Sequence, residues 1–158
     1  MNIKLKPLLI SIGIALATGV VGMVIGGSSR QGLEGLALPS FMPPPIVFPI
    51  VWTILYVLMG IAAYIIYMTD RVSGQDKKTA LTIYFLGLIV NSLWTLIFFR
   101  LQLRLLGFFW ILIILALAVA TTIAFSKINP AAAYLMIPYI IWLIFASILN
   151  LTIYFMNK

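Results

Sequence analysis

Five long apolar stretches, separated by short polar or proline-rich connections, make up most of the chain. They occupy residues 8–25, 46–68, 80–99, 105–125 and 131–156. Each is close to the ~20 residues that an α-helix needs to cross a hydrocarbon layer of ~30 Å. Helices are the expected spanning elements because backbone polar groups in lipid must be paired within the segment. The pattern predicts an all-α membrane protein, a single domain over residues 1–158 built as a bundle of five transmembrane helices.

Composition points to lipid as the surrounding solvent. The 158 residues are 64% hydrophobic and 8% charged, far fewer charged residues than a soluble domain uses to cover its surface. The net charge of +7 comes from ten basic residues that lie at the ends of the apolar stretches. They form no continuous basic face, so we expect no nucleic-acid partner. Their distribution favours an inside N-terminus, with six basic residues inside against four outside.

The residue types that carry most enzyme chemistry are missing or badly placed. The chain has no cysteine and no histidine, and its three acidic residues lie outside the apolar stretches. This excludes thiolate and imidazole chemistry and the usual zinc ligands, and it argues against paired-carboxylate catalysis. We therefore expect no metal site, no required cofactor and no catalytic residue of a familiar kind.

The first connection, residues 27–45, is long and rich in proline. Pro43, Pro44 and Pro45 are consecutive, so this part cannot be helical and favours a stiff extended backbone. It could cover one end of the bundle or remain an exposed loop. In the preceding stretch, Gly22 and Gly26 are four residues apart, a spacing that lets two helices approach closely in lipid.

Several polar and aromatic residues recur at helical spacing inside the apolar stretches. In the last stretch, four residues lie four positions apart and so share one stripe of the helix: Pro138, Trp142, Ala146 and Asn150. A buried amide without a hydrogen bond costs several kcal/mol in an apolar medium, so Asn91 and Asn150 should face other helices or a cavity. The candidate ligand-binding residues are Phe48, Trp52, Tyr56, Asn91, Trp94, Pro138, Trp142, Ala146 and Asn150.

Two interpretations of these residues remain open. They could be ordinary helix packing in a passive scaffold, with asparagines joining helices. They could instead line an apolar pocket with a few orienting polar groups, suited to a flat hydrophobic ligand. Separately, Leu151, Tyr154 and Lys158 in "LTIYFMNK" match a loose sterol-contact pattern that is common by chance at helix ends.

Three segments resemble one known family. They are "VWTILYVLMGIAAY", "NSLWTLIFF" and "PYIIWLIFASILN". Together they are similar to the translocator protein family, also called TspO, tryptophan-rich sensory protein or peripheral benzodiazepine receptor. The chain departs from that family's pattern in the first loop, where Phe41 stands in place of tryptophan and Pro45 in place of glycine.

The resemblance implies a homodimeric, multi-pass membrane receptor or carrier for porphyrins such as protoporphyrin or haem. By matching position, it assigns the pocket to Trp52, Tyr56, Asn91, Trp94, Trp142 and Ala146. An alternative for bacterial members is light-dependent porphyrin degradation, for which Trp142 and Trp52 would be the candidates. We expect binding rather than catalysis, with membrane lipid as a further partner. A bacterial cell membrane is the expected location, because the chain shows no Arg-rich amphipathic transit peptide.

Overall fold

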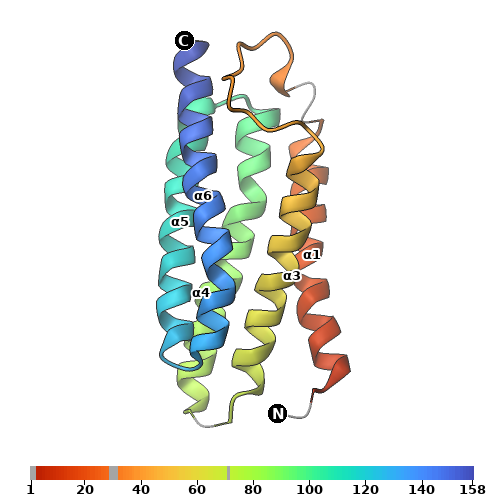
Figure 1. Ribbon diagram of the computed structural model, residues 1–158, viewed down its shortest axis with the longest axis vertical. Helices are drawn as coiled ribbons and strands as arrows, with labels where there is room; N and C mark the ends of the chain where they lie inside the picture. Colours follow the sequence, from red (N-terminus) through yellow and green to blue (C-terminus); the bar gives the residue numbers. More distant parts are fainter. Residues whose placement is uncertain (1–2, 29–31, 71) are drawn as a thin grey trace.

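Five long helices run side by side along one axis of the molecule (Figure 1). The computed structural model describes residues 3–28, 32–70 and 72–158, and within these ranges it contains no strand. Each of the five is long and apolar enough to cross a membrane, which confirms the predicted all-α membrane fold. The helices are α1 (Leu5–Gly26), α3 (Val47–Met68), α4 (Gly74–Thr95), α5 (Arg104–Ser126) and α6 (Pro130–Met156).

Helix α4 begins before the predicted apolar stretch of residues 80–99, and together with the π-helical turn that follows it ends one residue beyond that stretch. It begins at Gly74 rather than at residue 80 because Ser73 caps it: the Ser73 hydroxyl oxygen accepts a hydrogen bond from the Asp76 amide at 3.1 Å. At its other end the helix widens into a π-helical turn, η1 (Leu96–Arg100). The Leu101 amide donates to the Leu96 carbonyl at 2.9 Å across this turn. With η1, the helix spans 27 residues.

The helices bury one apolar face in the centre and leave another exposed. Helix α6 packs on α5 and α3, α1 packs on α3 and α4, and α4 packs on α5. Large apolar side chains such as Val24 and Ile141 are more than half exposed on the outside of the bundle, as is expected for a surface that faces lipid. Residues at the centre include Leu55, Met59, Leu88, Ile114, Met136 and Leu143.

Small residues hold α1 close to its neighbours. A methyl group on Gly60 of α3 would lie 2.6 Å from the Ile12 Cα, and the Ser11 hydroxyl donates to the Gly60 carbonyl at 2.7 Å. Gly26 faces Thr95 of α4 in the same way, and the Thr95 hydroxyl donates to the Gly22 carbonyl at 2.6 Å. The glycine pair of α1 is therefore used against α4 of the same chain.

The connection between α1 and α3 lies across one end of the bundle, next to the C-terminal end of α6 (Figure 1). Residues 29–31 of this connection lie outside the described part of the chain. The Ala37 amide donates to Asn157 Oδ1 at 2.8 Å, and Asn157 Nδ2 donates to the Ala37 carbonyl at 2.8 Å. Leu36 and Met42 pack against Phe98 and its neighbours. We call residues 32–46 the cover segment.

Candidate functional site

Six aromatic side chains from α3 and α6 form a continuous group, which we call the aromatic cluster. Trp52 is at its centre, with its ring stacked on Tyr56 at 5.5 Å between centroids and edge-on to Trp142 at 6.5 Å. Turns of α3 and α6 that face each other place these indoles together, as the sequence pattern predicts. The cluster comprises Phe48, Trp52, Tyr56, Tyr139, Trp142 and Phe145.

The cluster reaches the cover segment through Trp142 and Phe145. The Trp142 ring contacts Phe48 at 5.8 Å and Phe145 at 5.3 Å. Phe145 in turn meets Phe41 edge-on at 6.4 Å. Phe41 is the residue that departs from the family pattern, and it is about half exposed at this contact. The cover segment therefore touches Phe145, whose ring contacts Trp142, one of the residues that the sequence analysis assigned to the pocket.

Trp94 belongs to a second aromatic group at the end of α4. Its ring stacks on Phe98, with centroids 4.9 Å apart and ring planes 16° apart, and it meets Phe99 edge-on at 5.5 Å. A regular α-helix brings only residues three and four apart over one another. The wider turn of η1 lets the rings four and five residues after Trp94 contact it together.

A hydrogen bond between α3 and α4 satisfies Asn91. Its Nδ2 donates to the Tyr56 hydroxyl at 2.9 Å, and both side chains are buried. The amide thus faces a neighbouring helix, as predicted from the cost of burying it unpaired. The bond also fixes the Tyr56 ring beneath the Trp52 indole.

Polar atoms without a partner gather where α4, α5 and α6 meet. Asn150 is 1% exposed, and neither atom of its amide has a hydrogen-bond partner among the described residues. Nε1 of Trp94 has no partner there either. Nε1 of Trp142 is also unpaired, but it belongs to the aromatic cluster between α3 and α6. A methyl group on Gly107 would lie 3.1 Å from Asn150 Nδ2 and 3.6 Å from Trp94 Nε1, so α5 leaves room beside these two donors. We call Trp94, Trp142 and Asn150 the unpaired donors.

One of the four residues predicted to share an inward-facing stripe of α6 is exposed in the structure. Pro138 is exposed on the outside of the helix, Trp142 and Ala146 are half-buried, and Asn150 is buried. Residues four apart are offset by ~40° because an α-helix has 3.6 residues per turn. The stripe therefore turns from the lipid side to the interior over these residues, and Pro138 lies away from the rings.

The C-terminal sterol pattern remains a prediction. Leu151 and Tyr154 are half-buried and Lys158 is exposed. The Lys158 ammonium lies 5.0 Å from the centroid of the Phe155 ring, a residue outside the pattern.

Tyr139, Phe145 and Gly107 were missed by the sequence analysis. Tyr139 lies three residues before Trp142 and Phe145 three residues after it, so a test of the three-residue spacing would have found both. Gly107 gives no sequence signal that distinguishes it from the other glycines in membrane helices.

Hollows in the described surface lie away from the cluster. One of about 410 Å³ is at the opposite end of the bundle, and one of about 370 Å³ is on the outer face of α3 beside Ile50 and Ile54. Neither is lined by a ring of the aromatic cluster. In this structure the rings fill the space between α3 and α6, so a molecule that binds among them must separate them.

The fold and the site define a class. Five membrane-spanning helices with an aromatic cluster beneath a cover segment make this chain a multi-pass integral membrane protein. The model of the TspO/MBR family matches residues 10–156, and the chain belongs to this family.

Relatives match over almost the whole chain. Tryptophan-rich protein TspO of Archaeoglobus fulgidus is 38% identical, over 98% of this chain and 99% of its own. Tryptophan-rich protein TspO of Chlorobaculum tepidum is 32% identical over 99% of both chains. The translocator protein of Homo sapiens is 32% identical, over 91% of this chain and 88% of its own.

Proposed function

We propose that the protein binds a flat hydrophobic ring molecule between α3, α4 and α6, with a porphyrin such as protoporphyrin or haem as the ligand to test. The observation that carries the proposal is the set of unpaired donors, of which Trp142 belongs to the aromatic cluster and Trp94 and Asn150 lie where α4, α5 and α6 meet. Buried polar groups in proteins are almost always hydrogen-bonded, so a group left unpaired points to a missing partner. Here the unpaired groups lie next to ring faces.

The chemistry of the site suits such a ligand. Indole and phenol faces stack on a flat ring, and sparse polar groups orient it. The indole N–H groups of Trp94 and Trp142 can only donate, and the amide of Asn150 can donate and accept. Carboxylate and carbonyl oxygens of a ligand are suitable acceptors for each of these donors. A pure hydrocarbon would leave them unpaired, at a cost of about 1–3 kcal/mol for each buried group.

The names of the relatives are in line with a binding function. Some are called translocator protein and one is called tryptophan-rich sensory protein. Transport and sensing both begin with the binding of a molecule, and the proposal concerns that step.

The proposal is tested by titrating the purified protein with protoporphyrin in the dark and following tryptophan emission. We expect saturable quenching. Trp142→Phe should weaken binding about tenfold, equivalent to about 1.4 kcal/mol, because it removes ring area and one unpaired donor.

Trp110→Phe is the matched control. The Trp110 indole already donates to the Val90 carbonyl at 2.8 Å and has no ring contact with the aromatic cluster among the described residues. Its loss should leave the affinity unchanged. Quenching that does not saturate, or an equal loss of affinity in both variants, would refute the proposal and favour simple helix packing.

A further inference from the structure

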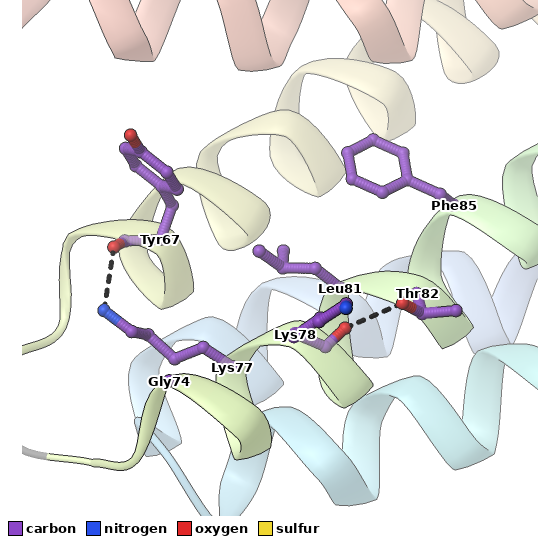
Figure 2. Close-up of a pocket in the computed structure, with 7 residues that line it drawn as sticks. All are labelled: Tyr67, Gly74, Lys77, Lys78, Leu81, Thr82 and Phe85. Carbon is purple, nitrogen blue, oxygen red and sulfur yellow. Dashed lines mark hydrogen bonds between the residues drawn. The ribbon is translucent and has the colours of Figure 1, made fainter.

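The second feature that could bind a molecule lies at the opposite end of the bundle from the aromatic cluster. There, a pocket of about 410 Å³ opens between the end of α3 and the start of α4 (Figure 2). Tyr67 comes from α3, and Lys77, Lys78, Leu81 and Phe85 come from α4. We call this the lysine pocket. No residue of the aromatic cluster takes part in it, so it is a separate site.

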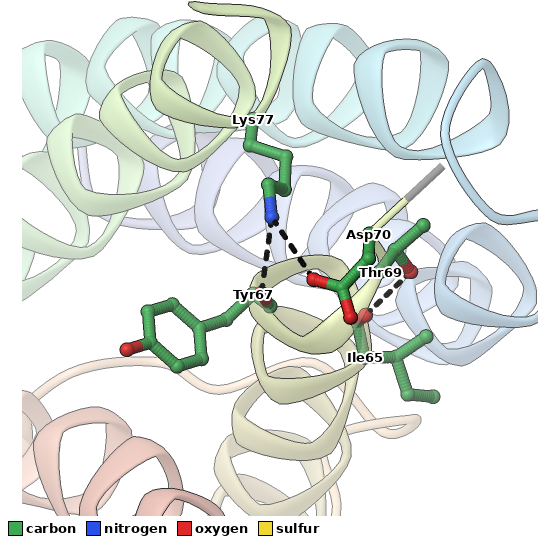
Figure 3. A network of polar contacts seen from close by, with 5 residues as sticks. All are labelled: Ile65, Tyr67, Thr69, Asp70 and Lys77. Atoms are coloured by element: carbon green, nitrogen blue, oxygen red, sulfur yellow. Dashed lines mark hydrogen bonds and ion pairs between the residues drawn. The ribbon is translucent and has the colours of Figure 1, made fainter. Parts of the chain in front are cut away.

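The two lysines of the pocket differ in how they are bonded. The Lys77 ammonium lies 3.5 Å from the Tyr67 carbonyl and 3.9 Å from the Asp70 carboxylate (Figure 3). It thereby caps the last carbonyls of α3. The Lys78 ammonium has no hydrogen bond or ion pair with any residue that the structure describes. Lys77 is thus held by long contacts of 3.5 and 3.9 Å that leave its ammonium able to bind a further group, and the Lys78 ammonium is wholly available to a ligand.

Away from the lysine ammonium groups, the wall of the pocket is apolar and extends along the axis of the bundle. Lys78, Leu81 and Phe85 lie three and four residues apart, so they share one face of α4. Phe85 is 39% exposed, and the Tyr67 ring, which comes from α3, lies across the pocket from it (Figure 2). From Lys78 to Phe85 the face extends ~10 Å along the helix. A molecule bound here would meet charge at one end and hydrocarbon at the other.

The charge around the pocket favours an anion. At this end of the bundle the described residues carry lysines at positions 4, 6, 77, 78 and 127, against Asp70 and Asp76. Basic groups beside membrane-spanning helices attract anionic lipid head groups. A purely water-soluble anion would fit the pocket less well than a lipid, because such an anion would leave the apolar wall uncovered.

We propose that the lysine pocket binds an anionic phospholipid, with the phosphate on the ammonium groups of Lys78 and Lys77 and one acyl chain along Leu81 and Phe85. The Asp70 carboxylate, which is 94% exposed beside Lys77, competes weakly with the phosphate for that lysine.

The test measures lipid binding to delipidated protein in a neutral detergent by native mass spectrometry. Phosphatidylglycerol is compared with phosphatidylcholine of the same acyl chains. We expect phosphatidylglycerol to bind in preference. Lys78→Gln should weaken it about fivefold, the effect of about 1 kcal/mol for one basic residue at the membrane surface. Asp70→Asn should strengthen it, because the competing carboxylate is gone.

Two controls separate this site from general attraction and from misfolding. Lys6→Gln removes the same charge from the exposed face of α1 at the same end and should weaken binding much less than Lys78→Gln, because Lys6 does not line the pocket. The gain expected for Asp70→Asn cannot arise from a damaged fold. Equal losses for Lys6→Gln and Lys78→Gln would overturn the proposal. So would glycerol phosphate competing as well as the intact lipid, which would show a site for free phosphate instead.

Discussion

Two buried tyrosines of the bundle differ in whether their hydroxyl groups are hydrogen-bonded. The Tyr56 hydroxyl accepts a hydrogen bond from Asn91, whereas the hydroxyl of Tyr84 has no partner among the described residues. Both rings are buried. The two side chains therefore allow the value of one buried hydrogen bond to be measured against an internal reference.

Tyr56→Phe should lower the free energy of unfolding by about 1–3 kcal/mol, because it leaves the Asn91 amide buried and unpaired. Tyr84→Phe removes a hydroxyl that bonds to nothing described and should be neutral or stabilising. Unfolding in mixed micelles, followed by circular dichroism, measures both. Equal destabilisation by the two variants would show that the Asn91 bond adds nothing.

Much of the site was predictable at the level of residues. Trp52, Tyr56, Asn91 and Trp142 converge because helical spacing places them on facing sides of their helices, and the cost of a bare amide assigns Asn91 to the interior. Pro138 was misplaced because the ~40° offset of each four-residue step accumulates along a helix. The surroundings of Asn150 depend on how three helices meet, and the spacing of residues in one sequence does not encode that.

At the level of elements, apolar length was sufficient to predict the five helices. The additional turns of α4 were not predicted, because they contain polar residues that a hydropathy pattern leaves out. The π-helical turn η1 was also missed, since hydropathy reports burial and carries no information on backbone hydrogen bonding. It is this turn that brings Phe98 and Phe99 together on Trp94.

The close contact between α1 and α3 should depend on Gly60 having no side-chain carbon. Gly60→Ala would place a carbon 2.6 Å from the Ile12 Cα, so the helices must separate. We expect the free energy of unfolding to fall by about 1–3 kcal/mol.

Gly13→Ala on α1 is the counterpart, because nothing lies within 4 Å of the added carbon. That variant should gain up to about 1 kcal/mol from lower backbone entropy in the unfolded chain. The same micelle titration compares them, and a stable Gly60→Ala variant would contradict the close approach.

For the whole molecule, the two ends are built differently. One end carries the lysine pocket, and the other carries the cover segment (Figure 1). The sequence left open whether residues 27–45 cover the bundle or remain exposed. In the structure, part of this connection lies across one end of the bundle. The side-chain amide of Asn157, more than a hundred residues away, binds it there through two hydrogen bonds to Ala37. No local pattern could predict that pairing.

Asn157→Ala should free the cover segment. We expect the Ala37 amide to exchange with deuterium faster, and protoporphyrin to bind and leave faster, if the segment controls access to the aromatic cluster. Thr152→Ala is the control, since among the described residues that exposed hydroxyl bonds only to the Ile148 carbonyl of its own helix. Faster exchange without any change in the rates of ligand binding would show that access lies elsewhere.

The pairing of Asn157 with Ala37 also has a practical result for anyone who handles the protein. A fusion partner or affinity tag joined after Lys158 would begin two positions from Asn157, whose side chain is hydrogen-bonded to the cover segment. Helix α1, which an N-terminal tag would precede, begins at the far end of the bundle (Figure 1). Assays with C-terminally tagged protein should therefore be checked against an N-terminally tagged version before any rate is assigned to the protein itself.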